Sequence, residues 1–90
     1  MGKRYLIKTR CGSFYAIIRF GKRDRVYFVS IPAFPDVLTE ARSLSEAKKY
    51  AVELITLQCR AAFDEGKVVV DDMKQVFGKY ARSGAVSFAV

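Results

Sequence analysis

The chain has 90 residues, of which 51% are hydrophobic and 28% are charged, and its formal net charge is +7 at pH 7. This composition excludes an intrinsically disordered chain, and the length suits one domain with one core. No apolar run approaches the roughly 20 residues that span a bilayer, and MGKRYLIKTR lacks the apolar stretch of a secretion signal. We therefore expect one cytoplasmic domain over residues 1–90, without membrane contact.

The basic residues are concentrated in the first third of the chain. Residues 1–30 contain eight lysines and arginines but one acid, Asp24, and so account for the whole net charge. This distribution favours a locally acidic partner, with nucleic acid as one choice. The alternative is that the charges only hydrate the outer face of a sheet and prevent edge-to-edge pairing.

Three strands are predicted first. Residues 4–10 alternate between two faces, and residues 14–20 and 26–31 are rich in aromatic and β-branched side chains. The segments CGS (11–13) and GKRDR (21–25) predict tight turns between them. We therefore expect a three-stranded antiparallel meander, and an α+β fold once the following helix is added.

The only two prolines, Pro32 and Pro35, end the third strand. Proline has no N–H group for a strand ladder and keeps the preceding residue out of the helical region. The prolines therefore predict an extended crossover, in which residues 37–41 fit a short extra strand.

One long helix follows the crossover. Ser43 and Glu46 have the spacing of a capping box, so the helix is expected to run from Leu44 to about Glu65 and to end at Gly66. Helical spacing places one apolar stripe against the sheet. The stripe consists of Leu44, Ala47, Ala51, Leu54, Ile55 and Ala62.

The core is expected over about residues 4–70, with residues 71–90 as an extension. Residues 67–70 predict a short strand, 71–80 a short helix, and 85–90 a final strand. Asp72 and Gln75 have capping-box spacing, so Asp71 and Asp72 are interpreted as helix caps rather than metal ligands. The apolar surface exceeds the needs of one small core, which predicts a dimer or tetramer. The expected self-association residues are Tyr50, Leu57, Ala61, Val86, Phe88 and Val90.

The sequence lacks the residues of a typical active site. It contains no histidine, no Gly-rich phosphate loop and only two cysteines, Cys11 and Cys59. Cys59 is interpreted as a small buried side chain in the helix, and Cys11 as a free thiol in a turn. We expect no enzyme activity, no cofactor and no metal.

The segment IPAFPDVLTEARSLSEA, residues 31–47, resembles without a gap the signature of HicB-like antitoxins. The likeness covers about residues 5–70. It implies a partly degenerate ribonuclease-H-like α+β fold used for binding, assembly into dimers or tetramers, and a small HicA-type RNA-cleaving toxin as partner. The residues that match the family pattern are Pro32, Pro35, Thr39, Ser43, Glu46 and Ala47.

The chain also departs from that family. Asp36 and Ala41 stand where glycines are usual, and Arg42 where an acid is common. About twenty residues follow the likeness, too few for a helix-turn-helix, so operator binding is not expected. The net charge is basic, whereas HicB-like antitoxins tend to be acidic.

Three functions follow from these observations. The first is a HicB-like antitoxin of a toxin–antitoxin system. The second is a small nucleic-acid-binding domain, for which we expect weak binding. The third is a structural accessory protein of the same fold. The residues expected to contact nucleic acid are Lys8, Arg10, Lys22, Arg23 and Arg25.

Overall fold

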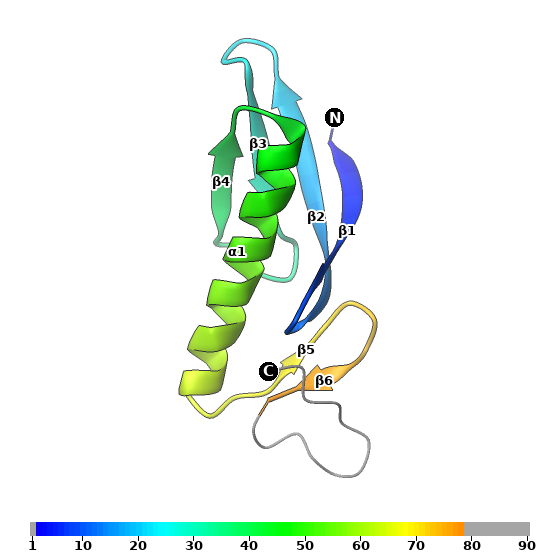
Figure 1. Cartoon of the computed structure of the whole chain (residues 1–90), viewed down its shortest axis with the longest axis vertical. Helices are drawn as coiled ribbons and strands as arrows, with labels where there is room; N and C mark the ends of the chain where they lie inside the picture. Colours follow the sequence, from blue (N-terminus) through cyan, green and yellow to red (C-terminus); the bar gives the residue numbers. More distant parts are fainter. Residues whose placement is uncertain (1, 79–90) are drawn as a thin grey trace.

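The computed structural model describes residues 2–78, and these form an α+β fold of one sheet, one helix and a small hairpin (Figure 1). The antiparallel sheet follows chain order, with β1 at Lys3–Thr9, β2 at Gly12–Gly21, β3 at Val26–Ser30 and β4 at Leu38–Ala41. The helix α1, Leu44–Asp64, lies across one face of this sheet. The hairpin pairs β5, Val69–Val70, with β6, Val76–Phe77. The predicted strand over residues 85–90, with Val86, Phe88 and Val90, falls outside the described residues.

The predicted meander is confirmed, although its first turn is one residue earlier than expected. Thr9 pairs with Gly12, so Arg10 and Cys11 form a two-residue turn. The Thr9 hydroxyl accepts the Cys11 N–H at 3.0 Å and donates to the Gly12 carbonyl at 2.8 Å. These bonds close the turn beyond the last pair of the strand ladder and so fix the residue at which β2 begins.

The proline crossover forms two successive turns. The Phe34 N–H donates to the Ile31 carbonyl at 2.8 Å, and the Val37 N–H donates to the Phe34 carbonyl at 3.0 Å. The chain then reverses into β4, which pairs antiparallel with β3. The extra strand expected at residues 37–41 is therefore confirmed, and it is one edge of the main sheet within residues 2–78.

The helix begins where the sequence indicates. Ser43 is the N-cap, and its hydroxyl accepts the Glu46 N–H at 3.1 Å. The Glu46 carboxylate in turn accepts the Arg42 N–H at 2.8 Å, one residue before the usual partner of a capping box. At the other end, Gly66 adopts a φ of 78°, a left-handed conformation that suits glycine and ends the helix.

Small side chains hold α1 close to the sheet. Ala47, Ala51, Ile55 and Cys59 are fully buried along the helix and meet the buried ends of the sheet side chains. Leu54 is only half-buried, so the predicted stripe is correct at its centre and shifted by part of a turn toward Cys59. Close packing of this kind leaves little room for added volume or charge.

The short helix predicted over residues 71–80 is wrong for residues 71–78, the part of that range that the structure describes. Residues 71–75 form a turn that leads into β6. One carboxylate oxygen of Asp71 accepts the N–H groups of Met73 at 3.0 Å and Gln75 at 2.8 Å. Aspartate stabilises turns by this kind of local bond, which competes with helix formation.

The two acids also fasten the hairpin to β2, so their interpretation as helix caps is wrong as well. The Ser13 N–H donates to Asp71 at 2.8 Å, and the Tyr15 N–H donates to Asp72 at 2.7 Å. Since β3 pairs with β2 only from Ile17 onward, these N–H groups have no strand partner. Gly12 permits the approach, because a Cβ atom there would lie 2.7 Å from the Asp71 Cβ.

Replacing Ile55 by aspartate should lower the free energy of unfolding by several kcal/mol, on the order of 4, because the charge would enter a site with no exposed surface. Val52→Asp is the matched control, since Val52 lies on the same helix and is 38% exposed. It should cost about 1 kcal/mol or less. Urea denaturation measures both, and equal losses would contradict the assigned packing face.

Replacing Asp71 by alanine should cost about 2–4 kcal/mol, because three backbone N–H groups lose a charged acceptor in a buried position. Asp24→Ala, in the exposed turn between β2 and β3, is the control and should change stability by about 0.5 kcal/mol or less. Urea denaturation again gives the measurement. A loss no larger than that of the control would show that the hairpin is not fastened by Asp71.

Candidate interaction surfaces

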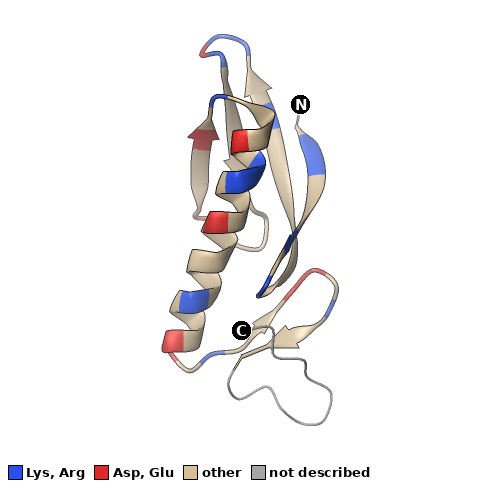
Figure 2. Ribbon diagram, viewed as in Figure 1, with Lys and Arg blue, Asp and Glu red and all other residues tan. Residues whose placement is uncertain are grey.

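The residues expected to contact nucleic acid do not form one cluster (Figure 2). Lys8 and Arg10 lie at the β1–β2 turn, whereas Lys22, Arg23 and Arg25 lie at the β2–β3 turn. The two turns are at opposite ends of β2, whose ten residues extend ~33 Å. A ligand that touches both groups must therefore run along the sheet.

The face of the main sheet opposite α1 connects the two turns, and we call it the outer face. The pairing register sets Arg4 opposite Ile17, Leu6 opposite Tyr15 and Lys8 opposite Ser13. On the side of β2 that pairs with β3, two more rows of the outer face run across β2, β3 and β4. These rows are Ile17–Ser30–Leu38 and Arg19–Phe28–Glu40.

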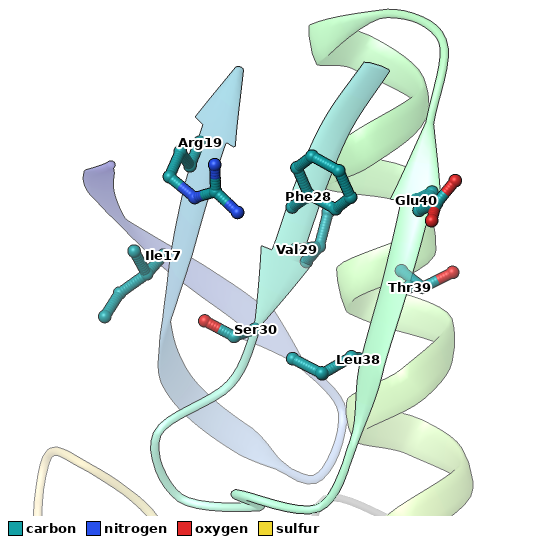
Figure 3. A pocket seen from close by; sticks show the side chains of 8 residues that line it. All are labelled: Ile17, Arg19, Phe28, Val29, Ser30, Leu38, Thr39 and Glu40. Atoms are coloured by element: carbon teal, nitrogen blue, oxygen red, sulfur yellow. The ribbon is translucent and has the colours of Figure 1, made fainter. Parts of the chain in front are cut away.

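No described element covers the outer face. Leu38 is 72% exposed, and Leu6 and Ile17 also have more than a third of their surface exposed. Figure 3 shows Ile17, Arg19, Phe28 and Leu38 projecting from the sheet on the side away from α1. The outer face is therefore an apolar and aromatic surface that carries positive charge.

Two arginines lie over aromatic rings on this face. The guanidinium carbon of Arg4 is 4.6 Å from the centre of the Tyr15 ring, and that of Arg19 is 4.6 Å from the centre of the Phe28 ring. Gly21 leaves room for the second pair, because a Cβ atom there would lie 2.5 Å from the Phe28 ring. The negative face of each ring attracts the guanidinium charge that lies over it.

A hollow of about 370 Å³ lies beside Phe28 on the outer face (Figure 3). Its lining mixes apolar and polar residues, with Arg19 on β2 and Glu40 on β4 at opposite sides and Ser30 on β3 between them. Such a site can hold a flat or extended ligand and offers both hydrogen-bond donors and acceptors.

The sequence analysis did not name Arg4, Arg19, Tyr15 or Phe28 as one site. Alternation along each strand identifies their faces, but the pairing of Arg4 with Tyr15 and of Arg19 with Phe28 depends on the strand register. The register in turn depends on the first turn, which lies one residue from its predicted place.

The residues of the HicB-like pattern all have structural positions. Pro32 and Pro35 are exposed in the crossover, and Thr39 is half-buried in β4. Ser43 caps α1, and Ala47 is fully buried against the sheet. That they are motif residues of the HicB-like family stays a prediction.

A second surface lies along one side of α1, next to β4. Thr39, Tyr50, Glu53, Leu54 and Leu57 line a shallow groove of about 290 Å³, which we call the flank groove. Leu57 is 61% exposed, and Ala61 is exposed one turn further along the helix. Tyr50 instead packs partly against the core. Of the expected self-association residues, Leu57 and Ala61 are thus accessible for contact.

The two cysteines are free and lie together inside the core, with Cys11 1% and Cys59 0% exposed. The interpretation of Cys59 as a buried side chain is confirmed, and Cys11 is buried too although it lies in a turn. Burial raises the pKa of the Cys59 thiol, and the neighbouring Cys11 acts in the same direction; together they bring it from 9.0 to about 12.

Within residues 2–78, no three His, Cys, Asp or Glu side chains lie close enough to hold a metal ion. The one helix in this part of the chain is not apolar enough to cross a membrane. Comparison of the chain with protein-family models, curated proteins and solved structures finds no match.

The raised pKa of Cys59 predicts a loss of stability at high pH. Since the folded state holds the thiol proton more tightly, this contribution is complete below about pH 9 and is lost as the pH rises toward 12. Between pH 8 and pH 10.5, the wild type should lose about 2 kcal/mol more than Cys59→Ala in urea denaturation. Identical losses of stability in the wild type and in Cys59→Ala would contradict the raised pKa of Cys59.

Proposed function

We propose that this chain is a non-catalytic, HicB-like interaction module, an antitoxin that binds and neutralises a small HicA-like RNA-cleaving toxin in the cytoplasm. The observation that carries the proposal is the segment of residues 31–47. Its prolines end β3, its threonine lies in β4, and its capping box begins α1, in the order of the family pattern. A ribonuclease-H-like origin of the fold is part of the proposal.

Electrostatics supports the flank groove as the toxin contact. A basic toxin is repelled by the outer face, where Arg4, Lys8 and Arg19 lie. The flank groove contains one acid, Glu53, and the exposed apolar side chain of Leu57. An apolar contact with an acid beside it suits a basic protein partner better than a surface of like charge.

The proposal includes assembly into dimers or tetramers. Leu57 and Ala61 extend the apolar surface of α1 beyond the sheet, and β4 offers an open strand edge beside them. Exposed strand edges and apolar helix flanks are common protein contact surfaces. We assign self-association to the Ala61 end of α1 and to the edge of β4 that pairs with no other described strand. Leu57 borders both this contact and the flank groove, so Leu57→Lys should weaken both.

The test uses the product of the neighbouring reading frame, which the proposal expects to be a small, basic protein containing histidine. This product should cleave RNA, and the present chain should suppress the cleavage at about equimolar ratio. Leu57→Lys should weaken suppression tenfold or more, because it adds a positive charge to the contact. Met73→Lys is the matched control, since Met73 is 44% exposed in the β5–β6 turn.

Sedimentation at tens of micromolar gives a second measurement on the same variants. The wild type and Met73→Lys should sediment at two or four times the 10.2 kDa chain mass, and Leu57→Lys at a lower mass. A neighbouring product that is not inhibited would overturn the antitoxin proposal. A wild type that sediments as a 10.2 kDa monomer would overturn the assembly.

A further inference from the structure

We propose that the outer face binds single-stranded nucleic acid, along a path from Lys8 at one end of β2 to the Lys22–Arg25 turn at the other. Arg4 and Arg19 lie on this path between the two ends. The inference is independent of toxin binding, which is assigned to the opposite side of the sheet. It joins the two separated groups of basic residues into one site.

The first argument is the separation of charge. The outer face carries Arg4, Lys8 and Arg19. The acids described beside it are Glu40 at the β4 edge, Asp24 in the β2–β3 turn, and Asp71 and Asp72, whose carboxylates already accept the Ser13 and Tyr15 N–H groups. The exposed side of α1 instead mixes acids and bases, as Figure 2 shows. Within residues 2–78 the only ion pair joins Lys67 and Glu65 at 2.9 Å, so no carboxylate neutralises the arginines of the outer face. An anionic partner would supply those missing counter-charges.

The second argument is the placement of the aromatic rings. Tyr15 lies on β2, and Phe28 lies opposite Arg19, four residues further along β2. The rows that hold the two rings are therefore ~13 Å apart. Each ring carries a guanidinium group, and bases stack on both aromatic rings and guanidinium planes. Between the two rows, Ile17 is exposed on β2, with Arg4 and Ser30 opposite it on the neighbouring strands.

The third argument distinguishes a single strand from a duplex. The hollow beside Phe28 has the room and the polar side chains, Arg19, Ser30 and Glu40, to receive an unpaired base by its edge. A duplex shows its bases only within its grooves, which helices and strand pairs enter. Here α1 lies on the other side of the sheet, so within residues 2–78 no helix lies on the outer face to enter a groove.

The experiment measures fluorescence anisotropy of labelled ten-nucleotide oligouridine, with a mixed-sequence duplex DNA as comparison, at 50 and 200 mM salt. The variant is Arg4→Gln/Arg19→Gln. The control is Lys49→Gln/Arg60→Gln, which removes the same charge from exposed positions of α1. The outer-face variant should lose tenfold or more in affinity and reduce the salt slope by about 1.4, and the control should lose less than threefold.

A second variant tests the rings separately from the charges. Phe28→Leu keeps an apolar side chain in β3 and should keep the melting temperature within a few degrees, yet lose about fivefold or more in affinity for oligouridine. Circular dichroism melting confirms that each variant is folded before its affinity is compared.

Three results would overturn the proposal. Equal losses in the outer-face variant and the α1 control would mean that net charge alone attracts the oligonucleotide. Tighter binding of the duplex than of oligouridine would exclude a single-strand site. In the third result, polyglutamate displaces oligouridine at equal charge concentration, and Phe28→Leu keeps its affinity for oligouridine. This would assign the face to an acidic protein instead.

Discussion

The packing of a single helix on one side of a four-stranded sheet is the constraint on which the other features depend. Ala47, Ala51 and Cys59 are small enough to let the helix backbone lie close to the sheet, and Ile55 fills the space between them. One helix can cover only one face. The structure therefore combines a well-packed core with an outer face that no other described element covers, and any partner of the outer face meets strands rather than helices.

This arrangement divides the molecule into two sides of different chemistry. The outer face presents arginines held over Tyr15 and Phe28, whereas the side with the helix presents mixed charges and the flank groove. A partner with negative charge and flat groups suits the first, and a protein with a complementary apolar surface suits the second. Both proposed contacts can be made at once, because the sheet lies between them.

The sequence predicted the elements that depend on local chemistry and missed those that depend on distant contacts. Alternation placed the meander, and the bonds of Ser43 and Glu46 placed the start of the helix. The segment after the helix was misread because its acids bind Ser13 and Tyr15, which lie 58 and 57 residues earlier. For the same reason the paired arginines and aromatic rings could not be found without the strand register.

The fastening of the hairpin to β2 has a consequence for the order of folding. The meander pairs segments that are neighbours in the sequence. The bonds from Ser13 and Tyr15 to the two aspartates close a loop that contains the entire helix, and closing a loop of that length costs entropy that only a finished core repays. The end of β2 nearest Cys11 should therefore be the last part of the sheet to gain protection from hydrogen exchange and the first to lose it.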